Sequence, residues 1–262
     1  MAEYLINGCR MHVQRLGSGS PTTIFIHGLV MDNLSSWYFT VANRIAQTGS
    51  VLLYDLRGHG RSERSATGYS VEALVDDLHH LIQATDIKGP VRIVGNSFGG
   101  LLAIAYAHTY PASTAALILV DAHWSDEGWS DAMIETLSLK GAARDEKILG
   151  SFKHWLGRHS ERKRNRLATS ARALVEETSM LEELRNSKAL PEAALARLGM
   201  PVLAMYGSES DILDRGRRLA TSLPRCELKI FEGCSHSILW EATAQVTEEI
   251  EAWLAQIDGD RL

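Results

Sequence analysis

A serine placed between two glycines is the first group in the chain whose surroundings suggest chemistry. It stands in Gly95-Asn96-Ser97-Phe98-Gly99, after the apolar run VRIVG and before a helical pattern. A chain that turns from strand to helix within one residue leaves no room for side chains two positions before and after, so Gly95 and Gly99 are required. The turn exposes the Ser97 hydroxyl at a helix N-terminus, where developing negative charge is favoured. The pattern predicts a nucleophilic serine.

The elements that would position this serine follow from an alternation of short apolar runs and longer amphipathic ones. The short runs are rich in Val, Ile and Leu, as is typical of strands buried on both faces of a parallel sheet. Asn7-Gly8 lies between two further runs and predicts an antiparallel hairpin at the start. Together they predict an α/β fold with a doubly wound, mostly parallel sheet of about eight strands. The main expected strands cover residues 22–27, 51–55, 91–95, 116–121, 201–206 and 226–231.

One stretch interrupts this alternation. From about Trp124 to Leu190 the sequence has no strand pattern and reads as several short helices. We therefore expect a core domain formed by residues 1–123 and 191–262, with residues 124–190 inserted as a helical cap.

The serine motif, in its strand and helix setting, resembles the nucleophile elbow of the α/β-hydrolase fold family, and the resemblance extends over nearly all of the chain. A second landmark of that family is matched by Asp55-Leu56-Arg57-Gly58-His59-Gly60-Arg61-Ser62, whose polar side chains we interpret as scaffolding of a loop. The resemblance implies a serine hydrolase.

The family order of catalytic residues is serine, then an acid, then histidine. His236 lies in a loop after the last expected strand, which makes it the expected general base among ten histidines. The acid should follow the strand at 201–206, where Asp211 fits best and Glu209 is the fallback. Asp121, at the end of the strand at 116–121, is the position that some relatives use instead. The expected triad is thus Ser97, Asp211 and His236.

The family also implies two backbone N–H groups that bind the oxyanion. One is the N–H of Phe98, directly after the nucleophile. His27-Gly28 follows the strand at 22–27 and matches the start of the family's oxyanion loop. By that resemblance the second donor is Leu29, with Val30 as the less favoured choice, and His27 itself is interpreted as structural.

With this constellation we expect hydrolysis of a carboxylic ester or thioester through an acyl-enzyme, without cofactor or metal. The same triad could instead drive elimination, cyclisation or acyl transfer to an acceptor other than water. A small-molecule receptor with slow turnover is a third hypothesis. Carbon–carbon bond hydrolysis is less favoured, because the extra glycines common after the His-Gly pair of such enzymes are missing.

The expected cap is basic, with nine Lys and Arg against three Asp and Glu between Arg144 and Arg172. This charge is either a solvated helix face or a docking surface for an acidic carrier protein or an anionic substrate. Of the tryptophans, Trp37 and Trp124 are the candidates for lining the substrate pocket, because each follows closely on a strand end.

The composition supports a folded, acidic protein. The net charge is −5 and 45% of residues are hydrophobic, which argues against a nucleic-acid partner. Three scattered cysteines argue against a disulfide framework or a zinc site. We see neither a signal peptide nor a membrane span, so we expect a cytoplasmic protein without membrane partners.

Overall fold

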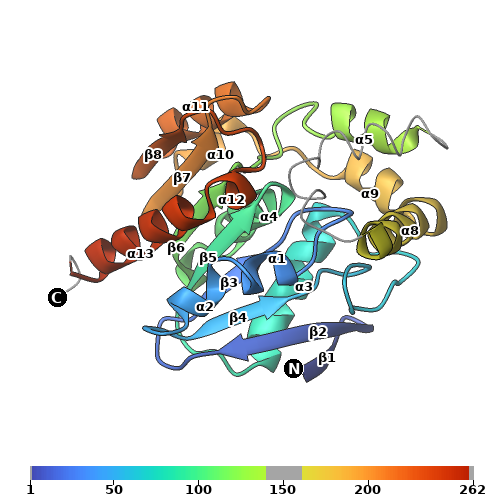
Figure 1. Ribbon diagram of the computed structural model, residues 1–262, viewed down its shortest axis with the longest axis horizontal. Helices are drawn as coiled ribbons and strands as arrows, with labels where there is room; N and C mark the ends of the chain where they lie inside the picture. The colour runs from blue at the N-terminus through green and yellow to red at the C-terminus, as the bar shows by residue number, and fades with distance from the viewer. Residues whose placement is uncertain (1, 140–160, 260–262) are drawn as a thin grey trace.

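A computed structural model describes residues 2–139 and 161–259. Eight strands form one sheet in the order β1-β2-β4-β3-β5-β6-β7-β8, with helices on both faces (Figure 1). The β1–β2 and β2–β4 pairs are antiparallel and all other pairs are parallel. The predicted doubly wound, mostly parallel sheet is thus confirmed. The strands are β1 (Ala2–Ile6), β2 (Cys9–Leu16), β3 (Thr23–Ile26), β4 (Val51–Tyr54), β5 (Val91–Asn96), β6 (Thr114–Val120), β7 (Val202–Gly207) and β8 (Cys226–Phe231).

The turn between β1 and β2 has the geometry that its sequence predicts. Asn7 and Gly8 both have positive φ, 47° and 75°, as a two-residue turn compatible with the strand twist requires. Ile6 pairs with Cys9 across this turn. The hairpin therefore forms the antiparallel edge of the sheet, as expected.

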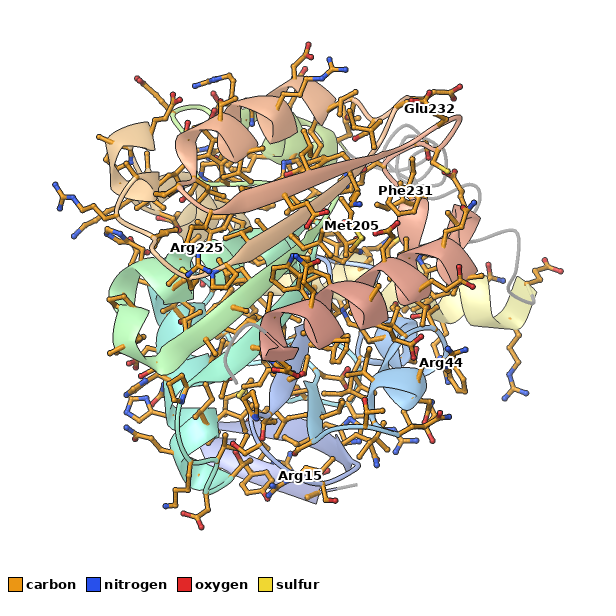
Figure 2. The ribbon with its side chains drawn as sticks, turned by 90° about the vertical axis from the view of Figure 1, so that its left-hand side faces the viewer. Arg15, Arg44, Met205, Arg225, Phe231 and Glu232 are labelled. Carbon is orange, nitrogen blue, oxygen red and sulfur yellow. The ribbon has the colours of Figure 1, made fainter. Side chains whose placement is uncertain are left out.

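Alternate residues of the central strands point to opposite faces, and each face is covered by its own helices. Phe25 and Leu53 pack with α1, α2 and α13, whereas Ile24 and Leu52 pack with α3, α4 and α11. Arg44 of α2 also forms an ion pair of 2.6 Å with Glu251 of α13 (Figure 2). These helices are α1 (Ser35–Tyr38), α2 (Ala42–Ile45), α3 (Val71–Ala84), α4 (Phe98–Thr109), α11 (Leu213–Ser222) and α13 (Thr243–Gly259).

The connection from β6 to β7 is helical in the part that the structure describes. Its helices are α5 (Asp131–Ser138), α8 (Glu161–Glu177), α9 (Met180–Asn186) and the short α10 (Glu192–Leu195). The remaining short elements are the 3₁₀ helix η1 (Pro111–Ser113) and α12 (Ile238–Glu241). Among all helices of the described residues, none combines the length and the apolar character needed to cross a bilayer.

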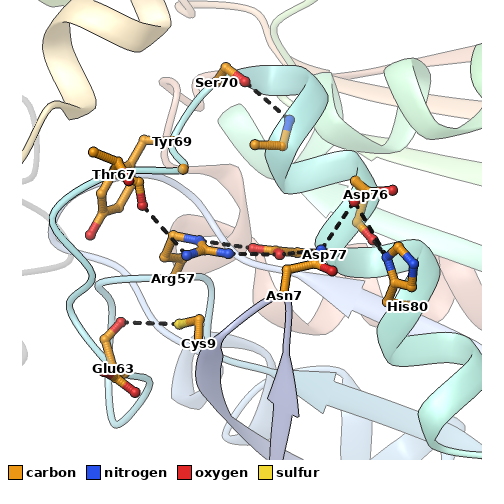
Figure 3. A network of polar contacts seen from close by, with 12 residues as sticks. Asn7, Cys9, Arg57, Glu63, Thr67, Tyr69, Ser70, Asp76, Asp77 and His80 are labelled. Carbon is orange, nitrogen blue, oxygen red and sulfur yellow. Dashed lines mark hydrogen bonds and ion pairs between the residues drawn. The ribbon is translucent and has the colours of Figure 1, made fainter.

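A buried ion pair joins the loop after β4 to α3 (Figure 3). Arg57 binds Asp77 through two parallel hydrogen bonds of 3.0 and 2.8 Å, and both side chains are almost fully buried. Asn7, in the β1–β2 turn, donates to the same Asp77 carboxylate at 2.9 Å. The pair therefore fixes three segments of the core against one another, because a buried charge is stable only when its partners are in place.

One carboxylate contributes strongly to the attachment of helix α9 to the core. Glu183 accepts hydrogen bonds from the backbone N–H groups of Gly68, Tyr69 and Ser70, at 2.9, 2.7 and 3.0 Å, just before α3 begins. Burial by itself would raise the pKa of Glu183, but the hydrogen bonds from Ser179 and these three N–H groups outweigh it and lower the pKa. The ionised side chain thus fixes the segment that leads into α3, while Ser70 caps that helix by accepting from the Ala73 N–H.

We expect Glu183→Gln to lower the free energy of unfolding by about 1–2 kcal/mol, since a charge-assisted hydrogen-bond set is weakened. A carboxylate with a depressed pKa stabilises the fold above its unfolded pKa and loses that effect as the pH falls through its folded pKa. The difference from wild type should therefore be largest at pH 7 and shrink below about pH 4.5 in urea titrations. Glu182→Gln, at an exposed neighbouring position, is the control. An equal loss in both variants would contradict a specific role for Glu183.

Candidate active site

Ser97 lies in a strained turn between β5 and α4. Its φ and ψ are 53° and −117°, a conformation that a residue with a side chain rarely adopts. A Cβ atom at Gly95 would lie 2.3 Å from the carbonyl oxygen of Gly99, and one at Gly99 would lie 2.3 Å from that of Ile26. The two glycines are therefore required by close backbone contacts, as the motif predicts.

The structure brings Ser97 and His236 together. The Ser97 Oγ lies 3.0 Å from Nε2 of His236, which stands in the loop between β8 and α12. On its other side, the His236 Nδ1 lies 2.8 Å from Oδ1 of Asp121, the residue that follows β6. A serine, a histidine and a carboxylate thus form one hydrogen-bonded chain, the arrangement that activates a serine hydroxyl for nucleophilic attack.

Asp121 is held in place by the neighbouring strand. Its side chain is fully buried; Oδ2 accepts from the Gly207 N–H at 2.9 Å, and Oδ1 accepts from Ser210 Oγ at 2.5 Å. Burial by itself would lower the pKa of His236, but the hydrogen bond to Asp121 and its charge raise that pKa, with a smaller contribution from Asp211. The fixed carboxylate makes His236 a stronger base and stabilises the imidazolium that forms when it takes a proton.

The prediction that Asp211 is the acid of the triad is corrected by this geometry. Asp211 and the fallback Glu209 both have exposed side chains in the loop after β7. The hydrogen bond to His236 comes from Asp121, whereas Asp211 affects the pKa of His236 only through its charge. An exposed carboxylate is solvated by water, whereas the partner of a catalytic histidine is buried and fixed by further donors. Asp121 meets that condition, and it was the alternative at the end of β6.

The two candidates for the second oxyanion donor, Leu29 and Val30, differ in the contacts of their N–H groups. The Val30 N–H donates to Nε2 of His59 at 2.8 Å, so it is already engaged. Burial, followed by the charge of His27, lowers the pKa of His59 to about 3, which keeps the ring neutral and able to accept. In contrast, the N–H groups of Leu29 and Phe98 have no hydrogen-bond acceptor among the described residues. This favours the predicted pair over Val30.

Two further side chains fix the start of this loop. Oδ2 of Asp32 accepts from the Gly28 N–H at 2.7 Å, and Nε2 of His27 accepts from the Leu56 N–H at 3.0 Å. His27 is thus engaged with backbone, in agreement with its interpretation as structural. A cavity of about 40 Å³ lies beside Ser97, Leu29 and His236, large enough for the reacting atoms but not for a whole substrate.

The two tryptophans expected in the pocket lie elsewhere. Trp37 is fully buried in the core, where it packs against Phe25 and donates to the Ile26 carbonyl at 3.0 Å. Trp124 is also buried, with the Arg218 guanidinium 5.7 Å from its ring centre. Neither lines the cavity beside Ser97. Their proximity to strand ends misled the prediction, because large aromatic side chains at such ends also fill the core.

One residue near the site was missed by the sequence reasoning. The ring of His123 lies 5.5 Å from the ring of His236, and its backbone N–H donates to the Ser97 carbonyl at 3.2 Å. Burial, with a smaller effect of His236, lowers the pKa of His123 to about 3. If Asp121 is taken as the acid, the position of His123 two residues later in the sequence predicts that it lies near the site.

Comparisons with known proteins agree with this fold. A family model described as alpha/beta hydrolase fold matches residues 21–243. A 2-hydroxy-6-oxononadienedioate/2-hydroxy-6-oxononatrienedioate hydrolase of Paraburkholderia phymatum is 27% identical over 94% of this chain and 91% of its own. An uncharacterised protein of Mycobacterium tuberculosis is 38% identical over 45% of this chain, but the match spans only 33% of that relative.

Solved structures give the same result for the fold. A thermophilic esterase from Thermogutta terrifontis superposes with a TM-score of 0.81 over 98% of both chains, at 19% sequence identity. The family model covers most of the chain, including β5, Ser97 and the start of α4. The protein is therefore a member of the α/β-hydrolase fold family.

Proposed function

We propose that the protein is a serine hydrolase that cleaves carboxylic esters or thioesters through an acyl-enzyme intermediate. The observation that carries the proposal is the hydrogen-bonded chain from Ser97 through His236 to Asp121. Ester and thioester cleavage needs only this chain and two oxyanion donors, for which Leu29 and Phe98 are the candidates.

The cycle has two halves. In the first, Ser97 Oγ attacks the carbonyl carbon while His236 Nε2 takes its proton, and the N–H groups of Leu29 and Phe98 hold the oxyanion. The tetrahedral intermediate collapses, and His236 returns the proton to the departing alcohol or thiol. In the second half, His236 takes a proton from water, the resulting hydroxide attacks the acyl group, and Ser97 leaves with that proton.

The segment of residues 124–190 serves, in this proposal, as a cap that shapes the substrate site. The excess of Lys and Arg in this segment suggests a more specific substrate, a thioester bound to an acidic carrier protein. Arg162 and Arg166 of α8 are exposed. The structure does not describe residues 140–160 or the side chains of Lys163 and Arg164.

A second candidate is hydrolysis of a carbon–carbon bond, because the relative from Paraburkholderia phymatum is named for a substrate of that kind. Such a reaction needs, besides the triad, a proton delivered to the departing carbon atom. If the purified protein turned over a 2-hydroxy-6-oxo dienoate with a higher kcat/KM than p-nitrophenyl butyrate, this candidate would replace the first.

We expect a fluorophosphonate probe to label Ser97 and the protein to hydrolyse p-nitrophenyl butyrate. Ser97→Ala should abolish labelling and lower kcat by at least about 10³-fold, since the nucleophile is lost while the oxyanion donors stay. Mass spectrometry of the labelled protein identifies the site, and Ser18→Ala, at an exposed loop position, is the control. Tight ligand binding without labelling would favour a receptor.

Replacing each of the two candidate acids in turn distinguishes their roles. Asp121→Asn should lower kcat by about 10³- to 10⁴-fold, because the amide no longer holds His236 in the required tautomer. Asp211→Asn should change kcat less than about threefold, since that side chain only adds to the local field. Steady-state kinetics on both variants, with melting temperatures to confirm folding, gives the comparison. A larger loss in Asp211→Asn would restore the sequence-based assignment.

The pH profile tests the same pair independently. His236 must be neutral to act as base, so kcat/KM should fall on the acid side with a midpoint above 6.5, the ordinary histidine value. In Asp211→Asn this midpoint should move to lower pH while the plateau is kept, because Asp211 contributes to raising the pKa of His236. An unchanged midpoint would show that Asp211 has no electrostatic effect on the base.

A further inference from the structure

A second cavity is lined in part by the residues that follow Leu29 in the loop after β3. Its volume is about 570 Å³, within the range of small-molecule sites. Four segments form its walls: β2, the loop that runs from Val30 into α1, the loop after β4, and the face of α8 that carries Arg166. The two cavities share Met31 and Asp32 as lining residues, so they adjoin at these two side chains.

Three arginines line this second cavity, which we call the arginine groove. They are Arg61 and Arg64 from the loop after β4, and Arg166 from α8. Within the described residues, the contact of the Arg64 guanidinium is a long ion pair of 3.6 Å with the exposed Glu177. Arg166 is exposed and has neither an ion pair nor a hydrogen bond with any residue in the described ranges 2–139 and 161–259.

The two carboxylates that line the groove accept hydrogen bonds from groups other than the guanidinium groups of Arg64 and Arg166. Asp55 is buried, and its oxygens accept from His12 Nδ1 at 2.8 Å and from the N–H groups of Leu34 and Arg61 at 2.8 and 2.9 Å.

The Asp32 carboxylate is likewise saturated. It accepts from the N–H groups of Gly28 and Asn33 and from the hydroxyl of Ser36. Burial raises the pKa of Asp32. His59, which also lines the groove, is neutral. Arg64 and Arg166 therefore present guanidinium groups to a ligand in the groove.

We propose that the arginine groove binds an anionic group on the substrate, so that the preferred substrates are esters carrying a carboxylate or phosphate at a distance from the scissile bond. The inference rests on the proposed hydrolase function. In this proposal the reacting carbonyl lies in the cavity at Ser97, and the rest of the molecule reaches the groove beside Met31 and Asp32, the two lining residues that the cavities share. Guanidinium groups bind carboxylates and phosphates through paired, charge-assisted hydrogen bonds.

The test compares matched esters that differ in charge. Neutral p-nitrophenyl butyrate is set against mono-p-nitrophenyl glutarate, with the anion on the acyl arm, and 4-butyryloxybenzoate, with the anion on the alcohol arm. Arg166→Gln should raise KM about fivefold or more for at least one anionic ester and less than twofold for the neutral ester. Arg166→Lys should restore part of the affinity, because it keeps the charge but not the fork geometry.

Arg162→Gln is the matched control, since it removes the same charge from the same exposed helix but lies outside the groove. It should leave KM of the anionic esters within twofold. The selectivity for the anionic ester should also fall with added salt in wild type and change little in Arg166→Gln. The proposal would be overturned if Arg166→Gln raised KM equally for all three esters. It would also be overturned if Arg162→Gln raised KM of the anionic esters as much as Arg166→Gln does.

The binding step can be measured apart from catalysis. Calorimetry of the Ser97→Ala protein with glutarate should show binding that Arg166→Gln weakens and Arg162→Gln does not. If wild type hydrolysed none of the esters while this pattern held, the hydrolase proposal would fail and the anion site would stand. If the neutral ester were hydrolysed and glutarate binding did not depend on Arg166, only the groove assignment would fail.

Discussion

The buried carboxylate of Asp121 is the contact on which the arrangement at Ser97 depends. It lies at the end of β6, accepts from the backbone of β7 and from Ser210, and binds His236, which follows β8. Three neighbouring strand ends are thereby joined by one side chain. Without a charge at this point, His236 would have no fixed tautomer, and Ser97 would have no base.

The oxyanion loop depends on neutral histidines in the same way. Burial keeps His59 uncharged, so that it accepts from the Val30 N–H, while His27 accepts from the backbone of Leu56. With Asp32 holding Gly28, these contacts leave the Leu29 N–H directed to no described acceptor. The His-Gly motif and the Asp-x-Arg-Gly-His motif lie far apart in the sequence. In the structure, hydrogen bonds join their two loops into a single scaffold.

Features with a short-range cause could be predicted from the sequence. The order and approximate limits of the strands follow from buried apolar runs, and the turn at Ser97 follows from the spacing of Gly95 and Gly99. The choice of acid could not be predicted, because Asp121 and Asp211 follow adjacent strands and differ chiefly in burial. The positions of Trp37 and His123 likewise depend on packing between segments far apart in the chain.

The contact between Glu183 and the residues before α3 also limits how the molecule could be redesigned. The helices between β6 and β7 are attached to the core partly through one carboxylate that satisfies three backbone donors. A helical segment transplanted from a relative would leave those donors unpaired unless it supplied an acceptor at the same place. Exchange of this segment between family members is thus a problem of matching polar groups, in addition to matching apolar surfaces.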